Sequence, residues 1–193
     1  MKTPLFGLTL QNGIKDNTMI TFKEYCKTIR EDWGKTSPIP KEVYTDVKWE
    51  DNFHWIDLGL PSGTLWADAD LVNPDDSKGF WTWDGIMDSE YAPFVPTQEQ
   101  MQELYDDGTW EWDSKTGMVF KGKYGKSITF FPEGHRENGA IYEADFVGNY
   151  WSSTYFGYNC AYSLTFDSGY ANPSNLGYRQ YGFLVRLVRS ANK

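Results

Sequence analysis

The stretch YWSSTYFGYNCAYSLTFDSGYANPSNLGYR, residues Tyr150–Arg179, is rich in Tyr, Ser and Asn and has almost no charge. Between Ser152 and Arg179 there is no Lys, Glu, Gln, Met or Trp, although the chain as a whole contains nine Trp and five Met. Short apolar runs separated by Gly, Asn and Ser are typical of β-strands joined by turns. The stretch therefore predicts a β-rich domain, and its composition needs an explanation of its own.

Alternation within this stretch predicts which side chains point inward. In CAYSLTFD, Tyr162, Leu164 and Phe166 fall on one side of a strand, and Ser163, Thr165 and Asp167 fall on the other. We expect the first three to be buried and the second three to face outward. The later run YGFLVRLVR, residues 181–189, is apolar on both sides, which predicts a central strand with both faces covered.

The flanking sequence adds helices and further strands. HWIDLGLPSGTLWADADL, from His54, predicts two short strands about a turn, and GMVFKGKYGKSITFFP predicts a hairpin. Thr97 and Gln100 form a capping box before a helix with Met101, Leu104 and Tyr105 on one face and Gly108 past its end. Few helices among many short strands indicate an α+β fold rather than a parallel α/β sheet.

Residues 1–50 differ from the rest of the chain in their sequence pattern, which is that of a helix and a linker rather than of strands. TFKEYCKTIREDWG predicts one amphipathic helix over about residues 22–33, and the proline-containing KTSPIPKEVYTD that follows is typical of a linker. We therefore expect an N-terminal extension over 1–50, for attachment or homo-oligomerisation, and a second domain over 51–193.

Composition limits the classes of partner. The net charge of -9 argues against a nucleic-acid partner, which would need clustered Lys and Arg. The chain has no apolar run long enough to span a membrane, so membrane insertion is not expected. Its first residues make a poor signal peptide. With two Cys in different contexts, Cys26 and Cys160, we expect unpaired thiols rather than a disulfide scaffold.

Five motifs in order carry a resemblance to a known family. They are DLGLPSGTLWA (57–67), VPTQEQMQEL (95–104), GHREN (134–138), NYWSS (149–153) and RQYGFLVRLVR (179–189). Together they resemble C-type-lectin-fold modules of the formylglycine-generating-enzyme branch, common in gut bacteria and their phages. The resemblance covers about residues 54–189 and implies a fold of short antiparallel or mixed strands, one or two helices and long loops. The segments FFPEGHREN and GFWTWDG depart from the usual pattern of the family.

Some members of this branch are variable proteins of diversity-generating retroelements, in which a C-terminal segment is rewritten at adenines. An AAC codon can then become any NNC codon, and NNC codons cannot encode Lys, Glu, Gln, Met or Trp. These five residue types are the ones missing here. The resemblance thus implies a diversified segment at about residues 152–181.

Exposed positions tolerate substitution with little change in stability, so we place ligand binding on the outward and loop positions of this segment. The expected ligand-binding residues are Tyr155, Phe156, Tyr158, Asn159, Ser163, Thr165, Asp167, Tyr170, Asn172, Asn175, Tyr178 and Tyr181. Their Tyr/Ser/Asn composition is that of an antibody-like paratope. The expected constant frame is Trp151, Tyr162, Leu164, Phe166, Gly182, Phe183, Val185 and Arg186.

The leading hypothesis is a non-enzymatic protein that binds a protein or glycan on a host or neighbouring cell, located on a virion or at a cell surface. One alternative is an oxidase like the formylglycine-generating enzymes, whose reactive cysteine pair would require Cys26 to approach Cys160. Another is a structural fibre or adhesin module. No cofactor and no catalytic residue are expected.

Other sequence features have plainer interpretations. His135 with Glu133 and Glu137 could suggest a metal or acid/base site, but a loop anchored by Arg136 is the favoured interpretation. The tryptophans of WTWDG and WEW could stack on sugars, but a scaffold role is favoured. A divalent-ion site at Asp68, Asp70 and Asp75 is an alternative to solvated surface, and ANPSN lacks the acidic ligand of a calcium-dependent sugar site. We expect no metal.

Overall fold

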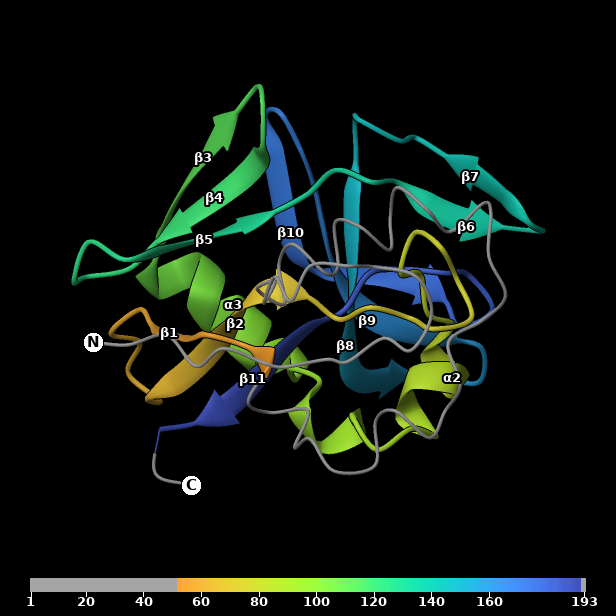
Figure 1. Cartoon of the computed structure of the whole chain (residues 1–193), viewed down its shortest axis with the longest axis horizontal. Helices are drawn as coiled ribbons and strands as arrows, with labels where there is room; N and C mark the ends of the chain where they lie inside the picture. The colour runs from red at the N-terminus through yellow and green to blue at the C-terminus, as the bar shows by residue number, and fades with distance from the viewer. Residues whose placement is uncertain (1–51, 192–193) are drawn as a thin grey trace, which may run out of the picture. The chain divides into compact units, whose positions relative to one another are not determined.

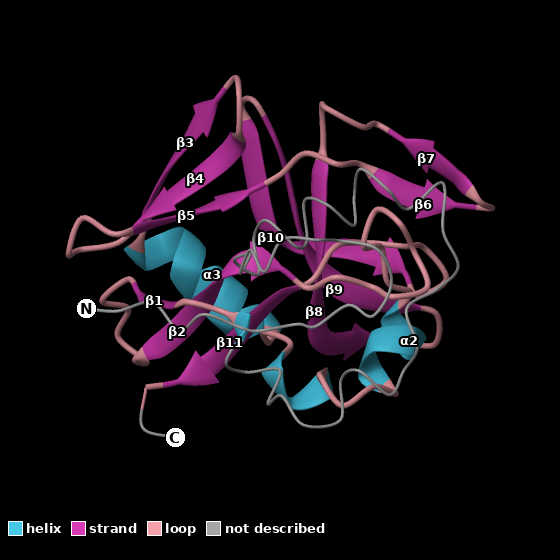
Figure 2. Ribbon diagram, in the orientation of Figure 1, coloured by secondary structure: helices cyan, strands magenta, loops and turns pink. Residues whose placement is uncertain are grey.

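The computed structural model describes residues 52–191. The helix expected at about 22–33 lies outside the described residues, and the domain boundary at 50–51 stays a prediction. The described chain is a mixed α+β structure made mostly of strands, with two α-helices, and every pairing between its named strands is antiparallel (Figures 1 and 2). The α+β prediction is confirmed.

The first sheet joins the two ends of the described chain. Its order is β1 (Trp55–Asp57), β2 (Thr64–Asp70) and β11 (Arg186–Ser190). The predicted turn closes between β1 and β2, where the Gly63 N–H donates to the Leu60 carbonyl at 3.0 Å. Strand β11 lies at an edge of this sheet, so its expected central position is wrong. Residues 183–188 are nevertheless buried on both faces, because the segment before β11 forms bridges to Trp81 and to Tyr150.

A second sheet is seen at the upper left of Figure 1 and a small two-stranded ribbon at its upper right. The sheet is the meander of β3 (Thr109–Asp113), β4 (Gly117–Lys121) and β5 (Ser127–Phe130), and its β4–β5 part is the predicted hairpin. The ribbon pairs β6 (His135–Glu137) with β7 (Ala140–Tyr142). Asn138, Glu143 and Asp145 around this ribbon have positive φ, between 48° and 70°.

The third sheet contains the stretch Tyr150–Arg179, which we call the uncharged stretch because Asp167 and Arg179 are its only charged residues. Its order is β8 (Gly148–Phe156), β9 (Cys160–Asp167) and β10 (Tyr170–Tyr178), with β9 in the middle. Both ladders are irregular, one between Trp151 and Tyr155 and the other between Asn172 and Asn175. Such bulges re-aim side chains and increase strand twist. The stretch is therefore one continuous antiparallel meander.

Two helices flank this sheet. Helix α3 (Gln98–Asp107) begins at the predicted capping box, where Thr97 accepts from the Gln100 N–H and the Gln100 side chain accepts from the Thr97 N–H. Its Met101 and Leu104 are buried, as the helical spacing predicts. Helix α2 (Trp83–Met87) is a short helix capped by Thr82, and a 3-10 turn, η3 (Ala92–Phe94), lies between the two helices.

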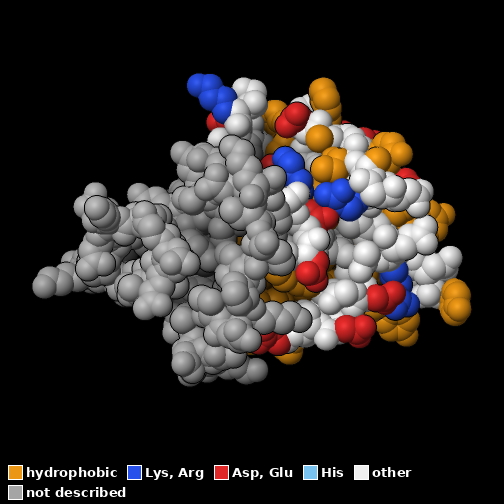
Figure 3. All heavy atoms as spheres, turned by 45° about the vertical axis from the view of Figure 1, so that its right-hand side comes forward, with side chains coloured by type: hydrophobic (Ala, Val, Ile, Leu, Met, Phe, Trp, Pro, Cys, Tyr) orange, Lys and Arg blue, Asp and Glu red, His pale blue; other side chains and the backbone are white. Residues whose placement is uncertain are grey.

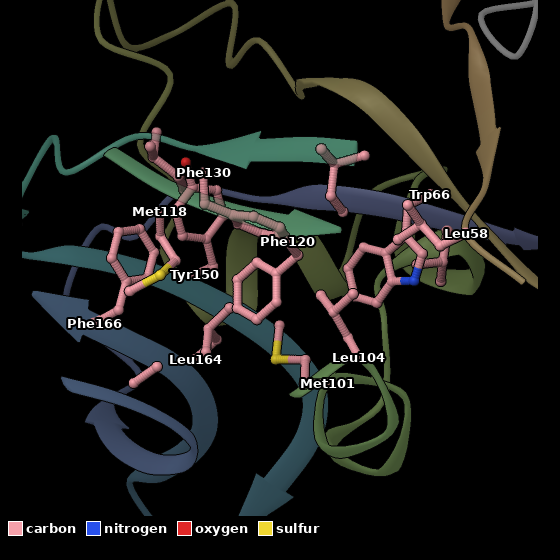
Figure 4. Packing of buried hydrophobic residues seen from close by; sticks show 14 of the residues in the cluster. Leu58, Trp66, Met101, Leu104, Met118, Phe120, Phe130, Tyr150, Leu164 and Phe166 are labelled. Atoms are coloured by element: carbon pink, nitrogen blue, oxygen red, sulfur yellow. The ribbon is translucent and has the colours of Figure 1, made fainter. Parts of the chain in front are cut away.

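The core lies between α3 and the sheets. Trp66, Met101, Phe120, Phe130, Leu164 and Phe166 are almost fully buried and belong to one cluster, in which the rings of Phe130 and Tyr150 meet edge to face at 4.7 Å (Figure 4). Such aromatic contacts add to the stabilisation from burial. Leu164 and Phe166 thus hold the uncharged stretch to the rest of the fold.

One buried ion pair joins the first sheet to this core. The Arg186 guanidinium donates to Asp70 Oδ1 from Nε at 2.8 Å, to the Ala67 carbonyl and to the Thr129 carbonyl. Asp70 also accepts from the Tyr150 hydroxyl at 3.1 Å. Burial, together with the Asp70 carboxylate, raises the pKa of Tyr150 well above its ordinary value. Asp70 therefore belongs to the structural frame.

Candidate functional site

The structure divides the twelve predicted ligand-binding residues by exposure. Six are exposed: Tyr155, Phe156, Tyr158, Asn159, Tyr170 and Tyr178. Five are half-buried: Thr165, Asp167, Asn172, Asn175 and Tyr181. Ser163 is fully buried, so its expected outward position is wrong: it lies opposite the buried Trp151 on β8. Tyr158 is 95% exposed, the highest value among the large hydrophobic side chains described.

Strand register shows which of these residues come together. Tyr155 pairs with Ala161, while Phe156 and Tyr178 both pair with Cys160, so these residues lie at the same end of the sheet, at the β8–β9 turn, with Phe156 and Tyr178 on one face and Tyr155 on the other. Tyr170 pairs with Asp167 at the opposite end. The two ends are separated by the length of β9, about 23 Å at 3.3 Å per residue. The predicted residues thus do not form a single patch.

We call the residues around the β8–β9 turn the turn-end cluster: Tyr155, Phe156, Tyr158, Asn159, Tyr178 and Tyr181. The Tyr178 and Tyr181 rings meet edge to face at 5.4 Å, and Phe156 contacts Tyr162 in the same manner. An open hollow of about 490 Å³ is lined by Tyr158, Asn159, Tyr178 and Tyr181, and also by Asp84, Arg179 and Gln180. The cluster therefore offers aromatic and amide groups around a shallow depression.

Asp84, Arg179 and Gln180 were not predicted as part of the site. Arg179 pairs with Asp84, and its guanidinium lies over the Trp83 ring at 4.6 Å from the ring centroid. The available signal was the tryptophan-rich segment GFWTWDG, which includes the first residues of α2. The face turned to the viewer in Figure 3 shows hydrophobic side chains interspersed with separate acidic and basic ones.

Polar side chains in the middle of the sheet have partners within the fold. Asn175 donates to the Thr165 hydroxyl at 2.8 Å, and this hydroxyl donates to Asn149 Oδ1 at 2.9 Å. Asn172 accepts from the Ser174 N–H, and the Asp167 carboxylate accepts from the Gly169 N–H. These hydrogen bonds order the meander, so the half-buried residues have local structural contacts in addition to any outside ligand.

Helix α3 holds the centre of the uncharged stretch. The Gln98 N–H donates to the Thr154 hydroxyl at 3.0 Å, and the Gln98 side chain donates to the Ser174 hydroxyl at 2.7 Å. The Ser153 N–H donates to the Pro96 carbonyl at 2.8 Å. Strands β8 and β10 are thereby attached to the start of α3 by polar contacts.

The segment GHREN is anchored by Arg136, as predicted. Its Nε lies 2.5 Å from Asp76 Oδ2, and its guanidinium covers the Phe80 ring. His135 lies between the rings of Tyr142 and Tyr181, at 5.6 and 5.3 Å. Partial burial and the carboxylate of Glu137, to which the phenol hydrogen-bonds, raise the pKa of Tyr181.

The other described residues that could bind a metal, react or stack on a sugar either lie apart from one another or pack within the fold. Within residues 52–191, no group of three or more His, Cys, Asp or Glu is placed to hold a metal ion. Cys160 is a half-buried free thiol, and Cys26 lies outside the described residues. Trp110 stacks on Tyr105 and packs against the core, which agrees with a scaffold role. No helix in the described part of the chain is long and apolar enough to cross a membrane.

Comparison with known proteins gives no match to a family model, to a curated protein or to a solved structure.

Proposed function

We propose that residues 51–193 form a non-enzymatic ligand-binding domain that uses the turn-end cluster as its main contact surface. The observation that carries this proposal is the exposure of Tyr155, Tyr158 and Tyr178 in the same three-stranded meander whose Trp151 and Phe166 are fully buried. Side chains that contribute little to the core can change identity at small cost, typically about 0.5 kcal/mol or less. Contact residues and supporting residues are thus different residues of the same strands.

The chemistry of the cluster suits recognition of a large surface. Tyrosine offers a broad amphipathic contact area at the cost of only two torsions, and the Asn159 amide can adapt its hydrogen bonds to the partner. A standard interface buries about 800 Å² per partner. Because binding energy concentrates in a few aromatic anchors, we assign the main contribution to the three exposed tyrosines. The ligand in this proposal is a protein or glycan on a host or neighbouring cell.

The proposed fold is the C-type lectin fold. In its favour are the sequence order of the five motifs, the antiparallel sheet that brings both ends of the described chain together, and the single long helix α3 packed on the meander. In the same proposal the uncharged segment is a diversified region, and residues 1–50 serve attachment on a virion or at a cell surface.

A binding experiment with matched variants tests the function. The full chain is labelled and applied to an array of defined glycans and, by flow cytometry, to intact gut bacteria. Tyr155→Ala/Tyr158→Ala/Tyr178→Ala is compared with a control, Tyr124→Ala/Phe146→Ala, which removes exposed rings outside the segment. Loss of several anchors of about 2 kcal/mol each predicts at least a hundred-fold weaker binding for the triple variant only.

Two outcomes contradict the proposal. One is equal binding by the triple and control variants, and the other is a wild-type chain that binds nothing on either panel. A second test compares the coding sequence with its surroundings, where a near-copy of the segment differing at adenines, beside a reverse-transcriptase gene, is expected. Aldehyde formation on a Cys-containing sulfatase peptide with added copper would instead favour the oxidase alternative.

A further inference from the structure

Trp83, the first residue of α2, contacts both boundaries of the uncharged segment. Its indole N–H donates to the Ser152 carbonyl at 2.8 Å. Its backbone N–H donates to the Arg179 carbonyl at 3.0 Å, and its ring lies beneath the Arg179 guanidinium. Ser152 and Arg179 are the first and last residues of the segment that lacks Lys, Glu, Gln, Met and Trp. One side chain therefore ties together two points of the chain that are 27 positions apart.

Arg179 extends this connection to the β8–β9 turn. Its backbone N–H donates to the Asn159 carbonyl at 2.9 Å, and its guanidinium approaches the Tyr158 carbonyl at 3.4 Å while pairing with Asp84. The turn itself contains Gly157 with φ of 64° and exposed neighbours. Since the exposed side chains of the turn contribute little to the core, its conformation is held by the ladder pair between Phe156 and Cys160 and by these hydrogen bonds to Arg179.

A second tryptophan fixes the base of the same arrangement. The Trp151 indole N–H donates to the Trp81 carbonyl at 2.8 Å, two residues before Trp83. Segment 81–83 and the start of the uncharged stretch are thus joined by two indole hydrogen bonds in opposite directions. Trp151 is fully buried whereas Trp83 is only half-buried, so removing Trp83 disturbs the core much less.

We propose that Trp83 is a positioning residue that sets the conformation of the turn-end cluster. Its partners at Ser152 and Arg179, and those of Arg179 at Tyr158 and Asn159, are backbone carbonyls. Every residue type has a backbone carbonyl, so these contacts do not depend on which side chains occupy the exposed positions of the β8–β9 turn. Among the residues that make them, Arg179 also contributes its side chain. A surface of changing side chains thereby keeps one backbone geometry.

Hydrogen–deuterium exchange of the full chain tests this role without any ligand. Trp83→Ala removes both the ring beneath the Arg179 guanidinium and the indole hydrogen bond to Ser152, and it is expected to accelerate exchange of the Arg179 and Tyr181 amides roughly ten-fold, with Leu164 and Phe166 in β9 unchanged. Trp83→Phe keeps a ring beneath Arg179 but loses the indole N–H, so it should restore only part of the protection. Trp110→Ala, on the β3–β4 hairpin, is the control and should leave the Arg179 amide unchanged.

The proposal is overturned if the Arg179 amide of Trp83→Ala exchanges at the wild-type rate, or if β9 amides accelerate equally. Should Trp83→Ala fail to fold, Asp84→Asn decides, because it removes only an exposed ion-pair partner of Arg179. It should accelerate the same amides. The cluster's use for binding rests on the proposed function, but exchange does not depend on it. Failure of either idea is therefore distinguishable from failure of the other.

Discussion

Gly177 gives a sharp test of the division between frame and surface, because it lies inside the uncharged segment and yet touches the frame. A Cβ added there would come 2.5 Å from Phe183 Cε2 and 2.8 Å from Trp151 Cη2. These two rings are buried and stacked at 4.1 Å, so neither can move away freely. Gly177→Ala must therefore displace the stacked pair.

The change in the free energy of unfolding caused by Gly177→Ala is the difference between two opposing contributions. Overpacking a buried site costs about 1–3 kcal/mol, while replacing Gly by Ala in a strand recovers about 0.5–1 kcal/mol of backbone entropy. Because the added Cβ would meet two buried, stacked rings, the overpacking cost falls in the upper part of its range, about 2–3 kcal/mol, and the expected net loss in the free energy of unfolding is about 1–2.5 kcal/mol. In a domain of this size that corresponds to a melting temperature lower by about 2–10 °C.

The control is Gly169→Ala in the β9–β10 turn of the same segment. There the nearest atom to an added Cβ is Asp167 Oδ1 at 4.0 Å, and φ is not positive. Its unfolding free energy should stay within about 0.5 kcal/mol of wild type or rise slightly. Urea unfolding followed by tryptophan fluorescence measures both variants. Equal stability of the two variants would refute the assignment of Gly177 to the frame.

Three further substitutions probe the frame. Arg186→Met leaves the Asp70 carboxylate buried without its cation and should cost about 3–5 kcal/mol in urea unfolding; a loss under 1 kcal/mol would contradict the buried pair. Thr97→Ala removes the α3 cap and should cost about 1 kcal/mol, with faster amide exchange confined to the first turn of α3. Above about pH 10 the unfolded chain loses the Tyr150 proton while the folded chain keeps it, because the pKa of Tyr150 is raised in the folded state. The free energy of unfolding should therefore fall as the pH rises. Tyr150→Phe should flatten this alkaline decline, and an unchanged slope would assign the decline to other groups.

Local signals predicted the parts of the fold that depend on neighbours in sequence. The capping box at Thr97 and Gln100 gave the start of α3, and its helical spacing gave the burial of Met101 and Leu104. Period-two alternation correctly predicted the burial of Leu164 and Phe166, but Tyr162, which was predicted to be buried with them, is only half-buried. These features follow from backbone hydrogen bonding and side-chain direction within one helix or strand, so they depend only on residues that are close together in the sequence.

The features that were missed depend on contacts between distant segments. Ser163 was expected outside because alternation assumes one open face, but the residue directly opposite it on β8 is Trp151, whose buried ring shares that face and stacks on Phe183. The Asp70–Arg186 pair joins residues 116 positions apart. Helix α2 is too short for its periodicity to be seen, and it supplies both Trp83 and Asp84 to the site.

The central claim is that the exposed residues of the turn-end cluster can change identity without unfolding their support. A display library randomised at Tyr155, Phe156, Tyr158, Asn159 and Tyr178, sorted for protease resistance, measures this directly. Most members should resist protease as the wild type does, whereas few members of a matched library at Tyr150, Trp151, Leu164, Phe166 and Phe183 should do so. Equal resistant fractions in the two libraries would contradict the claim.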